Sequence, residues 1–284
     1  MNNQRMHMST SFGRGATMVR SSVPLDNGQI MRVAPSVFAA EKHDSRSERY
    51  AYIPTIEVLD GLRKEGFQPF MAVQSRCRDE NKREFTKHML RLRHASMIDA
   101  SEANEVILLN SHDGTSSYQM VAGMLRFVCT NSLVCGDGIT DIRVPHRGNI
   151  TDNVIEGAFT VLDQFAQVEH SRDDMRRLAL PRAAENALAT AAIALRWDED
   201  EHVPVNADQL LRPRRMADAQ DHSLWGAFNR IQENLLKGGM VGRDRNGRAR
   251  QTRAVTGIAQ DVKLNRALWT LAEELRKAIA PVEV

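Results

Sequence analysis

The sequence predicts an α+β fold, with a mostly antiparallel sheet in the N-terminal half followed by a helical C-terminal half. Two observations lead to this prediction. Between about residues 68 and 146 apolar and polar side chains tend to alternate, as in strands, and from Ile150 apolar side chains recur at three and four residues, as in helices. Strands that precede helices, instead of alternating with them, indicate α+β and not a doubly wound sheet.

Three regions follow from these patterns. Residues 1–48 are predicted to be an extended or disordered arm, residues 49–148 the strand-rich core region, and residues 149–284 the helical region with a basic, glycine-rich loop at 237–253. The arm has no acidic residue before Asp26 and lacks the apolar stretch of a secretory signal. Arg and Ser without acids also suit an organelle transit peptide, and a disordered arm is the preferred interpretation.

The first elements expected along the chain are a turn and a helix. Asp26-Asn27-Gly28 has the composition of a turn. A helix is predicted within 52–65, because Pro54-Thr55 suits a helix start and Gly66 suits a helix end. Its apolar positions at helical spacing are Ile56, Leu59 and Leu62.

Strand signals fill the next part of the chain. Residues 70–78 and 85–94 alternate in hydrophobicity, and the polar turn Asp79–Lys82 separates them. The apolar run 105–110 predicts a strand that is buried on both faces. The pattern over 118–128 fits either a strand or a helix, and residues beyond it, 141–145, resemble a short edge strand.

Four helices are predicted in the C-terminal half. They cover about 150–166, 183–197, 224–236 and 255–279, where apolar residues repeat at helical spacing or alanine dominates. The segment 237–248 between the last two is rich in Gly and Arg and is predicted to be a flexible loop. Two tryptophans on the apolar helix stripes are expected in the core, Trp225 and Trp269.

Composition sets limits on the class of protein. The 284 residues are 42% hydrophobic and 26% charged, with a net charge of +2, so any argument for nucleic acid must come from local clustering of charge. The longest apolar stretch, 187–195, is too short to cross a membrane. No membrane partner is therefore expected, and the predicted compartment is the cytoplasm.

The three cysteines suggest no metal or disulfide framework. An odd count without CxxC pairs fits a reducing compartment. We interpret the cysteines as small buried thiols; a zinc site that uses His112 or His146 is the alternative. Neither a metal nor another cofactor is assigned. The cysteines are Cys77, Cys129 and Cys135.

Ser111, His112 and Asp113 have the residue types of a hydrolytic triad. They are consecutive, however, and neighbouring side chains of an extended segment point to opposite faces. We therefore interpret them as the polar lead into a turn at Asp113-Gly114 and assign no catalytic residue. In that turn the Asp113 carboxylate should accept an N–H two residues on, and Gly114 should have positive φ. Asn110 and His112 should close local hydrogen bonds.

Basic residues form two clusters that could contact phosphates. The first lies on the predicted strand face of 85–94 and on the neighbouring strand; an ordinary solvated sheet face is the alternative. The second occupies the glycine-rich loop, where a solubilising linker is the alternative, and the compensating acids lie apart from it, at Asp198–Glu201. The predicted DNA-binding residues are Arg76, Arg78, Lys87, Arg91, Arg93, Lys237, Arg243, Arg245, Arg248, Arg250 and Arg253.

Two stretches resemble the signature of a known family. They are Leu109–Ser116 and Leu125–Leu133, with a similar strand at Phe85–Arg93 and a similar helical end from Leu224 to Trp269. This signature is similar to that of the domain of unknown function 932 family, the phage/plasmid-like proteins. The resemblance implies residence on plasmids, prophages and integrative elements, and no activity. The matching residues, of unknown role, are Asn110, His112, Asp113, Gly114, Arg126, Cys129 and Asn131.

Three functions are compatible with these observations. The leading hypothesis is an accessory protein of a mobile genetic element that binds DNA, in particular single-stranded DNA, during transfer or recombination. The second is a counter-defence protein that binds a host protein. The third is a hydrolase or nuclease around His112 and Asp113. A cleft that joins these residues to Arg126 would support it. A homo-oligomer is also compatible with the sequence.

Overall fold

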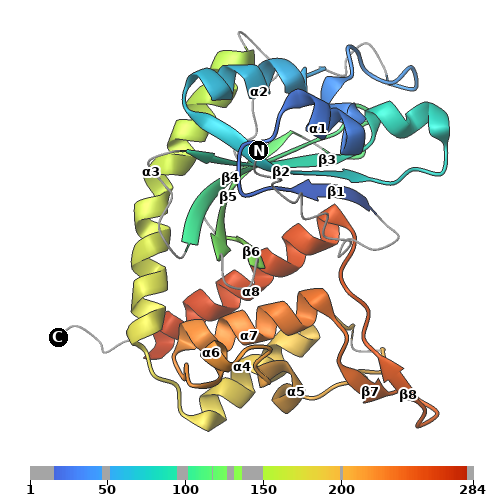
Figure 1. Cartoon of the computed structure of the whole chain (residues 1–284). Coiled ribbons are helices and arrows are strands. Elements are labelled where there is room, and N and C mark those ends of the chain that lie inside the picture. Colours follow the sequence, from blue (N-terminus) through green and yellow to red (C-terminus); the bar gives the residue numbers. More distant parts are fainter. Residues whose placement is uncertain are drawn as a thin grey trace, which may run out of the picture. The chain divides into compact units, whose positions relative to one another are not determined.

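The computed structural model describes residues 16–46, 52–94, 102–116, 118–126, 131–135, 150–198 and 201–279 (Figure 1). The chain divides into two compact units. Unit 1 contains the described residues up to Phe165 together with Thr256–Ile258, and unit 2 contains Ala166–Val255 and the described residues from Ala259 onward.

Unit 1 is built on one antiparallel sheet of six strands (Figure 1). The strands lie in the order in which they occur in the chain, so each pairs with its sequence neighbour. This arrangement confirms the predicted α+β class. The strands are β1 (Ala16–Arg20), β2 (Phe67–Ser75), β3 (His88–His94), β4 (Glu102–Asn110), β5 (Gln119–Arg126) and β6 (Asn131–Val134).

The segment 16–46 differs from the extended arm that was predicted. It contains β1, the helix α1 (Asn27–Val33) and the 3₁₀ helix η2 (Pro35–Phe38). The expected turn at Asp26 is instead a helix cap: its carboxylate accepts a hydrogen bond from the Gln29 N–H at 2.7 Å, and the Gln29 side chain accepts one from the Asp26 N–H at 3.0 Å. Such a reciprocal pair satisfies two backbone donors at the start of a helix.

Helices cover one face of the sheet in unit 1 (Figure 1). The predicted helix within 52–65 forms α2 (Thr55–Lys64), and its Leu59 and Leu62 are fully buried. The Thr17 hydroxyl of β1 donates to the Val33 carbonyl of α1 at 2.6 Å. These contacts place α1, η2 and α2 over the side chains of one strand face, where the core of the unit lies.

The remaining strand predictions agree closely with the sheet. Every residue of β4 is buried, as its apolar run indicated, and the ambiguous segment 118–128 contains β5. The polar turn predicted at Asp79–Lys82 lies at the start of the 3₁₀ helix η3 (Glu80–Phe85). The edge strand expected at 141–145 lies outside the described residues.

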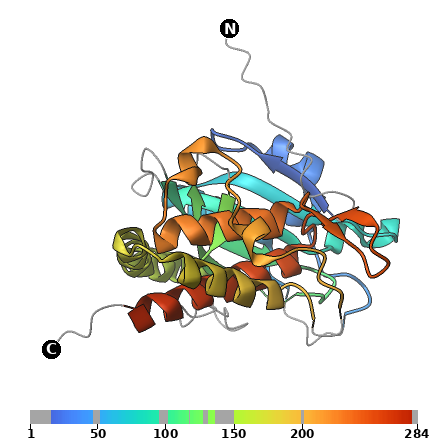
Figure 2. The ribbon, with the colours of Figure 1, turned by 90° about the horizontal axis from the view of Figure 1, so that it is seen from below.

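Unit 2 is helical. The long helix α3 (Ile150–Arg177) begins at the residue where the sequence period changes, and it runs from unit 1 into unit 2. Figure 2 shows α4, α7 and α8 side by side, and the Phe228 ring lies 5.5 Å from Trp225 and 6.1 Å from Trp269. Both tryptophans are core residues, as expected. The helices are α4 (Arg182–Ala194), α5 (Ala207–Leu211), α6 (Met216–Ala219), α7 (Leu224–Lys237) and α8 (Ile258–Ile279).

The predicted flexible loop after α7 is an ordered β-hairpin. Its strands are β7 (Val241–Arg243) and β8 (Ala249–Gln251), paired antiparallel. The turn forms because the Asp244 carboxylate accepts hydrogen bonds from the N–H groups of Asn246 and Arg248, both at 2.9 Å. Asp and Asn readily form such turns, so the glycines of this segment do not make it disordered.

Within the described part of the chain, no helix has the length and apolar character that crossing a membrane requires.

Candidate functional site

The basic face predicted on β3 does not form. Arg91 and Arg93 are buried, with 1% and 4% of their side chains exposed, and both bind Glu105 of the neighbouring strand. The carboxylate lies 3.0 Å from Arg91 Nη1 and 2.9 Å from Arg93 Nε. A buried guanidinium needs such an anion, and Glu105, which was predicted to begin an apolar run, supplies it. These two arginines are therefore inaccessible to phosphates in this structure.

Lys237 also differs from a free binding residue. Its ammonium lies 2.6 Å from Glu233, which additionally forms two hydrogen bonds with Arg215 at 2.6 and 2.5 Å. Burial pushes the pKa of Glu233 up, but the hydrogen bonds from Arg215 and Lys237 outweigh burial and hold that pKa below its usual range. Lys237 thus helps to keep a buried carboxylate charged at the end of α7.

Unit 1 contains three further cations that were predicted to bind DNA. Arg76 and Arg78 are exposed in the segment that follows β2, and Lys87 is half-buried just before β3. They belong to unit 1, whereas the second basic cluster belongs to unit 2.

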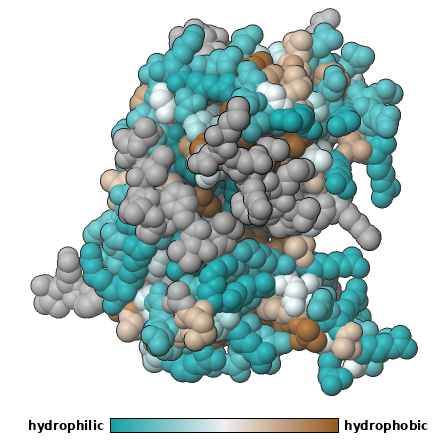
Figure 3. Space-filling view, viewed as in Figure 1, coloured by the Kyte–Doolittle hydropathy of each residue, from teal (hydrophilic) through white to brown (hydrophobic). Residues whose placement is uncertain are grey.

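The second cluster lies on one hairpin and the residues that follow it. We call it the arginine hairpin: β7, β8 and the residues up to Arg253. Its only carboxylate is Asp244, which is occupied by the turn, and in Figure 3 the surface at this end of unit 2 is mostly hydrophilic. Five predicted DNA-binding residues are exposed here, namely Arg243, Arg245, Arg248, Arg250 and Arg253.

Close packing against residues 202–209 holds the hairpin in place. A Cβ atom at Gly242 would lie 1.6 Å from the Pro204 carbonyl oxygen, so only glycine fits at this position. The Arg243 carbonyl lies 2.7 Å from His202 Nε2, and the Val241 carbonyl accepts from the Gln209 side chain at 2.6 Å. The arginines are therefore presented by a fixed element and not by a mobile loop.

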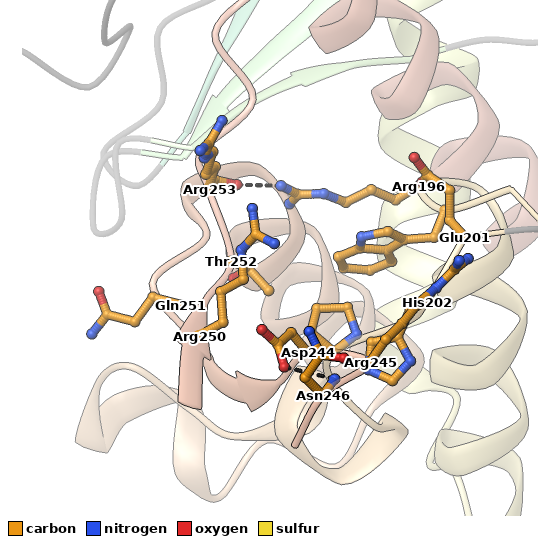
Figure 4. A pocket seen from close by; sticks show the side chains of 12 residues that line it. Arg196, Glu201, His202, Asp244, Arg245, Asn246, Arg250, Gln251, Thr252 and Arg253 are labelled. Carbon is orange, nitrogen blue, oxygen red and sulfur yellow. Dashed lines mark hydrogen bonds between the residues drawn. The ribbon is translucent and has the colours of Figure 1, made fainter. Parts of the chain in front are cut away.

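A pocket of about 610 Å³ adjoins the arginine hairpin (Figure 4). We call it the hairpin pocket. Arg196 donates a hydrogen bond to the Arg253 carbonyl, and its guanidinium carbon lies 4.9 Å from the centre of the Trp197 ring. Burial lowers the pKa of Arg196. Sequence reasoning missed this site, because Arg196 and Trp197 were assigned to a helix end.

The acids at Asp198–Glu201 were expected to lie apart from the arginines, but Glu201 does not. Glu201 lines the hairpin pocket together with Asp244. Four lining arginines exceed these two carboxylates, which leaves a charge of +2 when His202 is neutral. An anionic or partly anionic ligand suits such a pocket.

The signature residues around Asp113 form the predicted turn. Asp113 Oδ1 accepts hydrogen bonds from the Thr115 N–H at 3.0 Å and the Thr115 hydroxyl at 2.6 Å. Gly114 has a φ of +75°, which is the conformation expected of it. Asn110 closes the end of β4, since its amide donates to the Ile53 carbonyl at 3.2 Å and to the Thr55 hydroxyl at 2.9 Å.

Asn110 begins a buried chain of hydrogen bonds centred on His88. The Thr55 hydroxyl lies 2.9 Å from His88 Nε2, the Ser36 hydroxyl lies 2.8 Å from Nδ1, and Ser36 also donates to Gln74 at 2.7 Å. Because Ser36 donates to Gln74, the Nδ1–H of His88 donates to Ser36, and every hydroxyl hydrogen finds an acceptor when Thr55 receives from Asn110 and donates to Nε2. This pattern requires a neutral imidazole.

His112 packs against His88 but does not join this chain. The two rings lie 5.3 Å apart, both residues are fully buried, and neither ring nitrogen of His112 has a hydrogen-bond partner among the described residues. The expected local hydrogen bonds are made by its backbone: the N–H donates to the Phe85 carbonyl at 2.8 Å, and the carbonyl accepts from the His43 N–H at 3.0 Å. Burial, together with the nearby His112, lowers the pKa of His88 to about 3. Burial lowers the pKa of His112 to about 4.

The other signature residues lie apart from this turn. Arg126 pairs with Glu102 at one end of the β4–β5 ladder, whereas the turn follows the opposite end, where Leu109 pairs with Gln119. Asn131 pairs with Arg126 through the backbone, and Cys129 lies outside the described residues. His112 is buried and lies near the opposite end of the ladder from Arg126, and this arrangement does not favour hydrolysis by these residues together.

Comparison with known proteins places this signature in a family. The family described as Domain of unknown function (DUF932) matches residues 42–269. The chain belongs to this family. It is also 54% identical over 268 residues to each of two Escherichia coli K12 proteins, UPF0380 protein YfjQ and UPF0380 protein YafZ, covering 94% of this chain and 97% of each relative. No solved structure matches the chain.

The DUF932 match includes both the signature turn and the arginine hairpin. Neither the family description nor the names of the relatives states an activity, so the two sites must be interpreted from their own chemistry. Among the residues that the structure describes, no group of three or more His, Cys, Asp or Glu could hold a metal ion. Cys135 is buried, whereas Cys77 is exposed, unlike the buried thiol that was expected.

Proposed function

We propose that this DUF932 protein binds DNA through its arginine hairpin, as an accessory of a mobile genetic element during transfer or recombination. One observation supports the binding above all: five exposed arginines lie on an ordered hairpin whose single carboxylate is held in the turn. The resemblance to phage/plasmid-like proteins supports the biological setting.

Phosphate is the group that these arginines are best suited to bind. Each guanidinium that neutralises a phosphate releases a condensed counterion, and this release drives binding that is independent of sequence. A hairpin already held by its packing on Pro204 loses less conformational entropy on binding than a flexible loop would. The net charge of only +2 means that this local field, and not the whole protein, attracts the polyanion.

The binding residues proposed here are fewer than the sequence indicated. Arg91 and Arg93 are omitted because Glu105 holds them in the interior, and Lys237 because Glu233 holds it. Arg76 and Arg78 remain exposed, so replacing them with Ser tests a second DNA contact on unit 1.

The host-protein alternative has less support. Exposed large apolar side chains mark protein-binding surfaces when they form a patch. Here those described are single residues on separate elements or loops, which are Val23, Met31, Phe159, Leu195, Met216, Val241 and Ile279.

The test is a salt titration of DNA binding with the purified chain. Wild-type protein should bind labelled single- and double-stranded oligonucleotides at low salt, with affinity that falls as salt rises. The triple variant Arg245→Ser, Arg248→Ser, Arg250→Ser should bind weakly. Its slope of log affinity against log salt should be shallower by about 2 for the single strand and about 2.7 for the duplex.

A matched control removes three exposed cations elsewhere: Arg32, Lys64 and Lys263, each replaced by Ser. Because it changes the net charge equally, it should retain most of the affinity. Equal losses in both variants, or no binding of the wild-type chain to either form of DNA at low salt, would contradict the proposal.

A further inference from the structure

We infer that the hairpin pocket holds one unstacked base against Trp197, so that the protein selects single-stranded over double-stranded nucleic acid. This inference rests on the proposed function, because the arginine hairpin supplies the phosphate contacts beside the pocket. It adds the form of the ligand, which the exposed arginines alone do not determine.

Trp197 differs from the other tryptophans of the chain. Of three in the sequence, Trp225 and Trp269 are only 2% and 3% exposed and belong to the core of unit 2. Trp197 is half-buried, and its ring lines the hairpin pocket. Its backbone N–H donates to the Ile193 carbonyl at 3.2 Å, which fixes it at the end of α4. A large aromatic ring at a fixed position in a basic pocket is a platform on which a base can stack. The Arg196 guanidinium lies over one face, 4.9 Å from the ring centre, so the base would use the other face.

The size of the pocket suits one base and not a duplex. Its volume of about 610 Å³ is within the range of sites for small ligands. In a duplex both faces of every base are covered by neighbouring pairs, so a base must leave the stack before it can contact an aromatic ring. A single strand presents its bases without that cost.

Exposed arginines of the lining supply hydrogen-bond donors for the same ligand, namely Arg245, Arg250 and Arg253. Arg196 is not one of them, because its Nη2 atom binds the Arg253 carbonyl and its Nη1 atom is buried. Figure 4 shows Arg196 and Arg253 close together, and Asp244, Asn246 and Arg245 grouped at another side of the pocket. The surplus of +2 in the lining favours the phosphate backbone on either side of the base.

The experiment compares a labelled oligothymidylate with a duplex of the same length, using the full chain. The single strand should bind at least about tenfold more tightly, as expected when stacking adds to phosphate contacts. Trp197→Ala should weaken single-strand binding by about 5- to 150-fold, the effect of losing one stacked base, with little change for the duplex. Trp197→Phe should keep most of the affinity because it keeps an aromatic face.

Tryptophan fluorescence gives a second readout that does not depend on affinity. Single-stranded DNA should quench the emission of the wild-type protein, and the quench should vanish in Trp197→Phe because the remaining tryptophans are buried. This readout still decides the matter if Trp197→Ala folds poorly. Phe159→Ala, which removes an aromatic side chain 39% exposed on α3, is the matched control and should bind as the wild type does.

The outcomes separate the two proposals. Equal affinity for single strand and duplex, or full single-strand affinity in Trp197→Ala, would overturn the stacked base while leaving binding by the arginine hairpin intact. Absence of binding to both forms would overturn the proposed function itself. Selective loss of single-strand binding in Trp197→Ala, with the quench lost in Trp197→Phe, would establish both.

Discussion

His88 and His112 make the stability of unit 1 dependent on pH. Their pKa values in the folded protein, about 3 and about 4, lie below the usual value of 6.5. As pH falls below 6.5 the unfolded chain therefore takes up protons that the folded chain does not, and stability decreases. The full stability is present above pH 6.5. Below pH 6.5, protonation of each histidine in the unfolded chain lowers the free energy of unfolding by up to about 1.4 kcal/mol per pH unit.

Thermal melting between pH 7.5 and about 5 tests this expectation, since most carboxylates stay ionised over that range. His112→Phe keeps a ring and removes one titrating group whose nitrogens make no hydrogen bond among the described residues. It should melt close to the wild type at pH 7.5 and lose less stability on acidification. Parallel pH profiles for the two proteins would show that His112 is not a source of the effect.

Gly114 provides a second prediction at the scale of one residue. Its φ is +75°, and an added Cβ would lie 2.7 Å from the Arg46 guanidinium. Gly114→Val should cost about 1 kcal/mol or more, because a β-branched residue is strained at positive φ and the arginine must move. The measurement is the free energy of unfolding in denaturant. Gly239→Val is the control, since its φ is +80° with no atom within 4 Å; an equal cost there would mean that the Arg46 contact is irrelevant.

At the scale of elements, the arginine hairpin should depend on one close backbone contact. Gly242→Ala would place its Cβ against the Pro204 carbonyl oxygen, a backbone atom that cannot turn aside. The hairpin should therefore detach, become more sensitive to trypsin and bind DNA more weakly, although every arginine is retained. Ala249→Ser, at an exposed position of β8 in the same hairpin, tests the effect of substitution itself. Wild-type protease resistance in Gly242→Ala would disprove the docking argument.

Local signals account for the elements that the sequence predicted correctly. The helix α2, the strand β4 and the turn at Asp113 each follow from periodicity or turn chemistry within a few residues. β1 and the hairpin strands were missed for a physical reason: strands of five and three residues are too short for a period to be recognised. β1 is also fixed by pairing with β2, a partner distant in sequence.

At the scale of the whole molecule, the candidate site was only half predictable. Exposed arginines of the hairpin follow from composition, but the burial of Arg91 and Arg93 depends on a carboxylate that another strand brings beside them. The hairpin pocket likewise combines the end of α4, the segment before α5 and the hairpin itself. Charge patterns in sequence cannot distinguish a cation in solvent from one that a distant residue neutralises.

The strand order of unit 1 also bears on how the chain acquires its structure. Each strand pairs with its chain neighbour, so most pairings need only a short loop to close, and such local topologies fold quickly. All six strands lie within residues 16–134, and unit 2 begins at Ala166. On the ribosome the six strands can therefore pair one after another before the residues of the arginine hairpin have been synthesised.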